Sequence, residues 1–320
     1  MGPQDTRISG PLAVLGSRSR RSTIARVSHQ LLRPEPGPTT LKVTRWGGTR
    51  LAALRGGAEL RGQAVGESWE FSTLPGHESE VAGQPLSTLL GGPLPFLAKL
   101  IDTALPLSVQ VHPGDVPGTP GKEEAWVVLA ADPGAHVWVG LADSCDPQEF
   151  RRAVAAGEPL LPLLRAIPAV PGTVVLVPAR TVHAIGSGIL LAEIQQPTDC
   201  TYRFHDHGSD RPIQPEQALA TLDFASTAQV WQPGDPPTTL AGKHVTLEIL
   251  GAGKHPREPA GPSLIIPVRG RGDVITATEE QPLDLGELVL ARPGPWRLEL
   301  APGSLCVIGQ VDAGADMLPR

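Results

Sequence analysis

The sequence predicts a mainly β protein, and three observations lead to this expectation. Of the 320 residues, 36 are Gly and 35 are Pro, which interrupt helices but suit short strands joined by tight turns. From Leu41 onward, short β-prone runs alternate with turn signals, as is typical of antiparallel sandwiches and barrels. Hydrophobic residues make up 40% of the chain, enough for real cores, and the length suggests about two domains.

The first predicted domain covers residues 39–225. Two stretches, 85–101 and 146–167, stand outside its β pattern. The second begins with Asp146 as a candidate N-cap and Pro147 at the first helical position, which predicts a helix start. We therefore expect a two-piece helical insertion at about 146–167, divided by Gly157, and one further short helix at 214–225. The predicted strands are 41–48, 67–73, 107–113, 124–130, 136–141, 173–179 and 188–196.

The second predicted domain covers residues 226–320 and reads as a smaller β-sandwich. Residues 1–38 differ from both domains, because they carry six Arg and end in the linker "RPEPGP". We expect them to form a basic, disordered tail. The predicted strands of the second domain are 244–250, 262–275, 286–291, 296–300 and 303–311.

Charge and cysteine content exclude several classes of protein. The formal net charge of −6 offers no overall attraction to nucleic acid or to an anionic membrane, so we expect neither as a partner. Cys145, Cys200 and Cys306 are widely spaced and odd in number, which fits a reducing cytosol better than a disulfide scaffold. No apolar run reaches the roughly 18 residues of a spanning helix. We therefore expect a cytoplasmic protein.

Four polar residues lie where strands could bring them together. In an extended strand Gln110 and His112 point to one face, while Val109 and Val111 point to the other. Glu124 opens the next strand, where a hairpin would place it beside His112, and His183 begins a later one. Gln, His, Glu and His form a mixed nitrogen and oxygen set without thiolates. Such a set suits zinc or another borderline divalent ion with an open coordination position.

The spacing of these residues resembles the cupin pattern. "Q-x-H-x(11)-E" stands at the first cupin motif, and "G-x(5)-P-x(4)-H" runs from Gly172 through Pro178 to His183. Further motifs make the resemblance closer, namely "WGGTRLA" (46–52), "GESWEFST" (66–73), "PFLAKLIDTALPLSVQVHP" (95–113), "GKEEAW" (121–126), "VPARTVHAIGSG" (177–188) and "QQPTDCTYRFHDHG" (195–208). Together they resemble the short bacterial type I mannose-6-phosphate isomerases. The resemblance implies two cupin-like jelly-roll domains, the second without a metal site.

The resemblance also implies a ligand set. One Zn²⁺ per chain would be held by Gln110, His112, Glu124 and His183. Glu123 is the competing carboxylate, but the family's ligand lies two residues before a Trp, as Glu124 lies before Trp126.

Around this metal the resemblance places the substrate-binding residues Lys99, Lys122, Arg203 and Glu193. Only five residues of the chain are Lys, and two of them lie in these motifs, where a sugar phosphate needs cations. Arg203, Lys122 and Asp199 are the catalytic candidates for an aldose–ketose isomerisation of mannose 6-phosphate to fructose 6-phosphate through a cis-enediol. The proton-transfer group stays open among Lys122, Asp199, Glu193 and a metal-bound water. The expected partner is a small sugar phosphate, and the expected state is a monomer or homodimer.

Two departures from the family pattern keep alternatives open. Arg180 replaces the usual glycine of the second motif, where it must accept the turn's backbone angle and could reach the mouth of the site. His205 and His207 resemble a metal arm, but we expect them outside the ligand set. A non-catalytic sugar-phosphate-binding protein therefore remains an alternative. A less favoured one is an iron-dependent oxygenase with a 2-His-1-carboxylate set.

Overall fold

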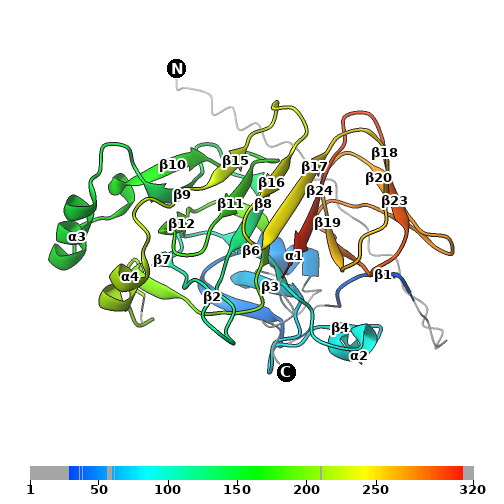
Figure 1. Ribbon diagram of the computed structural model, residues 1–320, viewed down its shortest axis with the longest axis horizontal. Coiled ribbons are helices and arrows are strands. Elements are labelled where there is room, and N and C mark those ends of the chain that lie inside the picture. Colours follow the sequence, from blue (N-terminus) through cyan, green and yellow to red (C-terminus); the bar gives the residue numbers. More distant parts are fainter. Residues whose placement is uncertain are drawn as a thin grey trace, which may run out of the picture.

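The fold consists of two β-sandwiches placed side by side (Figure 1). The computed structural model describes residues 29–312 apart from residues 36, 38, 56–59, 61 and 210. The main sheets are antiparallel throughout, as the sequence predicts for a mainly β chain rich in turns.

The first sandwich pairs a seven-stranded sheet with a five-stranded sheet. The order of the seven-stranded sheet is β15 (Gln229–Trp231), β11 (Val174–Val177), β8 (Glu124–Ala131), β13 (Ile189–Gln195), β6 (Leu97–Thr103), β2 (Leu41–Gly48) and β3 (Val65–Phe71). The order of the five-stranded sheet is β10 (Leu164–Pro168), β9 (His136–Leu141), β12 (His183–Ile185), β7 (Val109–Val111) and β14 (Tyr202–His205).

The second sandwich pairs a six-stranded sheet with a four-stranded sheet. The six-stranded order is β1 (Leu31–Leu32), β22 (Val289–Ala291), β19 (Ser263–Arg269), β24 (Leu305–Val311), β17 (Val245–Leu250) and β16 (Thr239–Ala241). The four-stranded order is β18 (Gly253–Arg257), β23 (Trp296–Leu300), β20 (Gly272–Ile275) and β21 (Glu280–Pro282).

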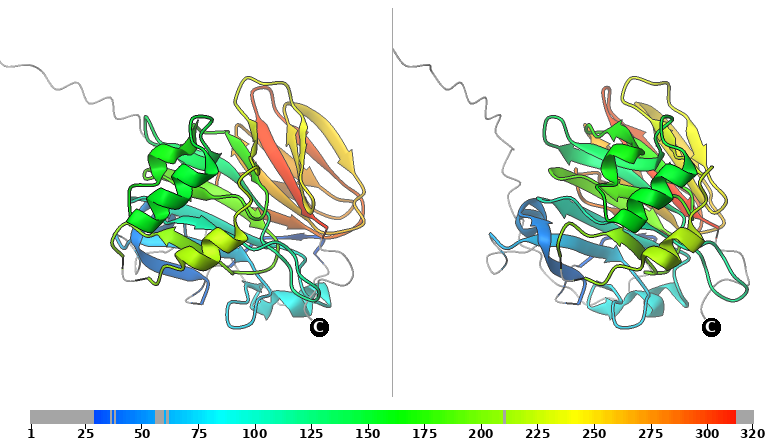
Figure 2. Two further views of the ribbon diagram at one scale, coloured as in Figure 1. Left: turned by 60° about the vertical axis from the view of Figure 1, so that its left-hand side comes forward. Right: turned by 90° about the vertical axis from the view of Figure 1, so that its left-hand side faces the viewer.

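The remaining elements are short and lie outside these sheets. Helices α3 and α4 cover the outer face of the five-stranded sheet, away from the second sandwich (Figure 2). Of the helices in the described residues, none is both long and apolar enough to span a membrane. The elements outside the four main sheets are α1 (Arg50–Arg55), α2 (Leu86–Leu90), α3 (Pro147–Ala156), η1 (Leu161–Leu163), α4 (Pro215–Thr221) and the small pair β4 (Glu80–Val81) and β5 (Gln84–Pro85).

Hydrophobic cores fill the spaces between successive layers. One core lies inside the first sandwich around Trp126 and Val139, and another lies inside the second around Ile265 and Leu298. The largest core fills the space between the two sandwiches, where side chains such as Ile194 meet those of the six-stranded sheet. The sandwiches are therefore packed as one stack of sheets.

Two predicted domain boundaries are wrong. Strand β15 lies beyond residue 226, yet it pairs with β11 in the first sandwich. Strand β1 lies within the predicted tail, yet Leu31 and Leu32 pair with β22 of the second sandwich and are buried. Local composition could not reveal either pairing, because each depends on a strand far away in the sequence. The prediction for residues 1–28 lies outside the described residues.

The predicted helices are confirmed in part. Asp146 caps α3 by accepting hydrogen bonds from the amides of Gln148 and Glu149, and Gly157 ends this helix in a left-handed conformation. The expected second helical piece is limited to the 3-10 helix η1 at residues 161–163, because residues 164–168 form β10 instead. Helix α4 is confirmed within 214–225. The stretch 85–101 divides into α2 and the first part of β6.

Candidate active site

Three predicted site residues lie side by side on the inner face of the five-stranded sheet. Gln110 of β7 pairs in register with His183 of β12 and with Arg203 of β14. Residues that pair directly across strands project to the same face of a sheet. Val109 and Val111 pack instead in the core beneath α3 and α4. The predicted alternation along 109–112 is thereby confirmed.

A second row faces the first from the seven-stranded sheet. Glu193 of β13 pairs in register with Lys99 of β6 on one side and with Trp126 of β8 on the other, and Lys99 pairs in turn with Trp69 of β3. Glu124 lies two residues before Trp126 and therefore shares its face. The site is thus built between two sheets, each contributing one row of polar side chains.

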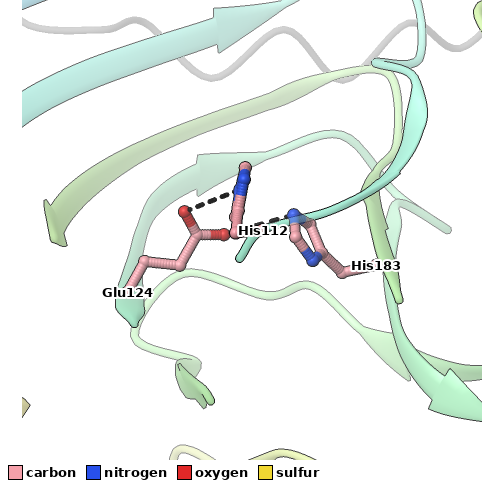
Figure 3. A group of neighbouring side chains, drawn as sticks. All are labelled: His112, Glu124 and His183. Atoms are coloured by element: carbon pink, nitrogen blue, oxygen red, sulfur yellow. Dashed lines mark ion pairs between the residues drawn. The ribbon is translucent and has the colours of Figure 1, made fainter. Parts of the chain in front are cut away.

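The centre of the site is a buried group of two histidines and one carboxylate (Figure 3). Nε2 of His112 lies 3.3 Å from Oε2 of Glu124, and Nε2 of His183 lies 3.4 Å from Oε1. Each of the three residues is 1% exposed. Their potential ligand atoms all lie within 4.8 Å of one another, which makes this group a candidate metal centre.

Hydrogen bonds to the backbone orient both imidazole rings. Nδ1 of His112 lies 3.0 Å from the carbonyl oxygen of Cys200, and Nδ1 of His183 lies 2.8 Å from that of Thr181. A carbonyl only accepts, so each Nδ1 carries the proton, and each Nε2 keeps a lone pair that a cation beside Glu124 could take. A hydrogen bond from Nδ1 to a backbone carbonyl, with Nε2 left for the metal, is the usual arrangement of metal-binding histidines. Oε1 of Glu124 is buried without a hydrogen-bond partner, so the donor set fits a cation.

Gln110 lies at the edge of this group. Its Nε2 is 3.1 Å from Nε2 of His183, while its Oε1 accepts a hydrogen bond from Ser108. Rotating the amide by 180° would present Oε1 to the centre and Nε2 to the Ser108 hydroxyl, which can also accept. Gln110 can therefore supply an oxygen ligand without loss of its contact to Ser108.

Lys122 supplies the positive charge nearest to the centre. Its Nζ lies 2.8 Å from Oε2 of Glu124 and 3.0 Å from Nε2 of His112. Burial, together with this ammonium, lowers the pKa of His112 to about 3. Burial alone would raise the pKa of Glu124, but Lys122 and the two histidines hold it well below its usual value. The centre therefore presents neutral imidazoles and an ionised carboxylate, as metal binding requires.

Lys99 lies among three carboxylates. Its Nζ is 3.4 Å from Glu193, 3.8 Å from Asp199 and 3.9 Å from Glu67, and it lies over the ring of Trp69. Burial alone would lower the pKa of Lys99, but Glu67 and Glu193 raise it above its usual value. Its charge is therefore already compensated by neighbouring carboxylates before an anionic substrate binds.

The three remaining predicted site residues, Glu193, Asp199 and Arg203, differ in their hydrogen bonds and surroundings. Oε2 of Glu193 accepts from the indole of Trp126 at 3.0 Å, its Oε1 has no hydrogen-bond partner, and burial raises its pKa. Asp199 lies at the rim with its side chain 60% exposed. Nε of Arg203 is buried without a hydrogen-bond partner, and burial lowers the pKa of this guanidinium. Arg203 is therefore a cation with an unused donor.

The structure corrects the predicted route by which Glu124 reaches His112. We expected a hairpin, but β7 and β8 belong to different sheets, and Glu124 faces His112 across the sandwich. Of the two neighbouring carboxylates, Glu124 joins the histidines, whereas Glu123 accepts hydrogen bonds from the second sandwich.

Sequence reasoning missed Glu67 and Ser108. Glu67 accepts a hydrogen bond from the indole of Trp69 at 2.7 Å and faces Lys99. It stands two residues before Trp69 in a predicted strand, so alternation could have placed both on one face. Ser108 supports Gln110, again from two residues away.

The two departures from the expected pattern make hydrogen bonds outside the candidate metal group. Arg180 adopts a φ of 68°, the left-handed conformation that the usual glycine favours, and its Nε donates to the carbonyl of Thr221 at the end of α4. Nε2 of His207 lies 2.9 Å from the carbonyl of Leu107, and the ring packs on His205. Neither histidine belongs to the candidate metal group of the described residues.

The chain is similar to known proteins in both sequence and fold. No model of a known protein family matches the chain. The chain is 30% identical over 283 residues to mannose-6-phosphate isomerase of Streptococcus mutans, a match that covers 76% of this chain and 87% of that protein. The crystal structure of the mannose 6-phosphate isomerase from Bacillus subtilis has 23% identity and a TM-score of 0.66, covering 88% of this chain and 99% of its own.

A second solved structure is a mannose 6-phosphate isomerase bound with zinc and yttrium, at 15% identity and a TM-score of 0.60. It covers 88% of this chain and 100% of its own. Likeness at this level of identity shows a common fold. The extent of the match to the Streptococcus mutans protein goes further, and it shows that this chain belongs to the mannose-6-phosphate isomerase family.

Proposed function

We propose that the protein is a zinc-dependent aldose–ketose isomerase that interconverts mannose 6-phosphate and fructose 6-phosphate through a cis-enediol. Membership of the family supports this reaction. The single observation that carries the proposal is the buried group of His112, Glu124 and His183, whose potential ligand atoms all lie within 4.8 Å of one another. Burying such a group costs stability, and a role in binding a metal would explain its presence in the core.

One zinc ion would be held by His112, Glu124, His183 and Gln110. Bound there, it would act as a Lewis acid that stabilises negative charge on the sugar oxygens O1 and O2. The nearby ammonium of Lys122 competes for the same lone pairs. We therefore expect Lys122 to turn toward the substrate when the metal is bound.

The remaining residues bind and orient the sugar phosphate. Arg203 has the unused buried donor, and we assign it to the enediolate or phosphate oxygens. Lys99 is compensated by three carboxylates, so we assign it to holding Glu193 and Asp199 in place beside the sugar rather than to carrying the phosphate alone.

The proton must leave C2 and return to C1. Lys122 lies at the centre, Glu193 is buried with a raised pKa, and Asp199 lies at the rim. Substituting each of these three residues by an uncharged one distinguishes proton transfer from sugar binding. Loss of the residue that transfers the proton should lower kcat by roughly 10²-fold to 10⁴-fold. A residue that only binds the sugar raises KM instead.

The deciding experiment is turnover of mannose 6-phosphate by purified protein as isolated, after chelation and after zinc is added back. We expect loss with the chelator and recovery with zinc. Binding of iron without any isomerase turnover would favour the oxygenase alternative. Binding of the sugar phosphate without turnover by zinc-loaded protein would favour the non-catalytic alternative.

The free thiols of Cys145, Cys200 and Cys306 fit the cytoplasmic location that we propose. We also propose a monomer or homodimer.

A further inference from the structure

We propose that the second sandwich positions the metal ligand Glu124 through two carboxylates of the first sandwich, Asp115 and Glu123, which bind residues 243–245. We refer to Asp115 and Glu123 as the carboxylate clamp. The inference rests on the proposed function for the metal that Glu124 holds.

Glu123 is the stronger half of the clamp. Its Oε2 accepts from the amide of Lys243 at 3.1 Å, and its Oε1 accepts from the amides of His244 at 2.9 Å and Val245 at 2.7 Å. Glu123 is 3% exposed. A Cβ at Gly242 would lie 2.3 Å from Oε1, so this approach requires glycine. Three successive backbone amides thus form an anion site in the second sandwich that a carboxylate of the first one fills.

Asp115 joins the same two parts of the molecule. Its Oδ2 lies 2.5 Å from Nζ of Lys243 and 2.8 Å from Nε2 of His244. Its Oδ1 accepts from the amide of Gly121 at 2.9 Å and from Nε2 of Gln196 at 3.0 Å. Asp115 therefore ties the segment that precedes Glu124 to the second sandwich.

The contacts continue along the chain to Glu124. The amide of Glu123 donates to Oε1 of Gln196 at 2.9 Å, and the carbonyl of Glu123 accepts from the amide of Gln196 at 3.0 Å. Both the backbone and the side chain of Glu123 are therefore held. Because side chains alternate in an extended segment, fixing Glu123 outward directs Lys122 and Glu124 inward, where they meet at 2.8 Å.

A second carboxylate bridge between the sandwiches provides a matched control. Glu70, which is 1% exposed, accepts from Nε of Arg55 at 3.1 Å, and Nη2 of Arg55 donates to the carbonyl of Gly286. This bridge starts from β3 and α1, more than fifty positions before Glu124 in the sequence. It joins the same sandwiches without touching the segment that carries the ligand.

The first test compares zinc affinity in Glu123→Gln and Glu70→Gln, measured on metal-free protein by competition with a chromophoric chelator. The glutamine amide cannot accept all three backbone donors. We expect Glu123→Gln to weaken zinc binding at least about tenfold, the loss typical of residues that orient a metal ligand. Glu70→Gln should stay within about twofold of wild type. Equal affinities in the two variants would overturn the proposal.

A second measurement needs no metal. Hydrogen exchange at amides 121–124 of the metal-free protein should become roughly tenfold faster in Glu123→Gln and stay unchanged in Glu70→Gln, since exchange reports local opening. Unchanged exchange in Glu123→Gln would overturn the clamp. If wild-type protein binds no zinc, the proposed function fails, and the exchange measurement still decides the clamp. If Glu123→Gln does not fold, Lys243→Ala, at a site 69% exposed, should change both readouts in the same direction.

Discussion

The two sandwiches share an architecture but differ in what they bury. Among the described residues, the first buries charged or ionisable side chains including Lys99, His112, Glu124, His183 and Glu193, whereas the polar residues buried in the second are Ser263, Thr276 and Ser304. Burying a charge costs free energy even when it is paired. The first sandwich carries that cost at its candidate site, while the second buries no charged side chain among the described residues.

The substitution with the largest expected effect is His183→Ala, compared with His207→Ala. Loss of His183 removes an imidazole lone pair from the candidate centre. We expect zinc binding to be lost and kcat/KM to fall on the order of 10³-fold, equivalent to several kcal/mol of charge stabilisation. His207→Ala should retain both, because its ring bonds the carbonyl of Leu107. Metal content and kcat/KM measured on both variants check this. Loss of zinc and activity in His207→Ala but not in His183→Ala would show that the metal centre lies elsewhere.

Leu247→Ala and Leu298→Ala compare the shared core with the core of the second sandwich. Both side chains are 0% exposed, so each truncation should lower the free energy of unfolding by about 3 kcal/mol. Because Leu247 packs in the core between the sandwiches, its loss should still give one cooperative transition by tryptophan fluorescence and circular dichroism. Two separate transitions in the Leu247 variant would contradict the shared core.

Arg203→Lys tests whether the guanidinium fork is needed at the site. Lysine keeps the charge but loses the buried Nε donor, so kcat/KM should fall roughly 10²-fold. Arg211→Lys is the control, because Arg211 pairs with Asp206 at 2.5 Å and lies outside the two site rows. Equal steady-state constants for the two variants would assign Arg203 a structural role.

Acidification should destabilise the metal-free protein through its site. The folded-state pKa of His112 is about 3 against an ordinary 6.5. Above pH 6.5 the His112 imidazole is neutral in both the folded and the unfolded state. Below pH 6.5 the imidazole binds a proton in the unfolded state but stays neutral in the folded state. Stability should therefore fall from pH 6.5 toward 3, by up to about 1.4 kcal/mol per pH unit from this group. Urea titrations check the slope, and His112→Gln should reduce it.

The smallest expected effect concerns the turn before His183. Arg180→Gly and Arg180→Ala both lose the hydrogen bond to Thr221, but only glycine relieves a φ of 68°. The glycine variant should be more stable than the alanine variant by about 1 kcal/mol. Thermal unfolding at one pH compares the two, and equal midpoints would show that this turn stores no strain.

The extent of prediction from sequence differs among the site residues. Gln110 and His112 could be placed on one face because alternation is a property of the strand itself. The compensation of Lys99 could not be foreseen, since Glu67 comes from one segment distant in the sequence from Lys99, and Glu193 and Asp199 come from another. The partners of β1 and β15 were missed for the same reason.

Most strands and the capped start of α3 could be predicted, because they depend on local patterns of hydrophobicity, turns and caps, and the residue types of the candidate metal group could be identified from motif spacing. In contrast, the meeting of Glu124 with His112 across the sandwich and the contacts of Glu123 with the second sandwich are visible in the folded chain alone. Sheet pairing and packing join segments that are far apart in the chain, and local propensity does not specify which of these segments will meet.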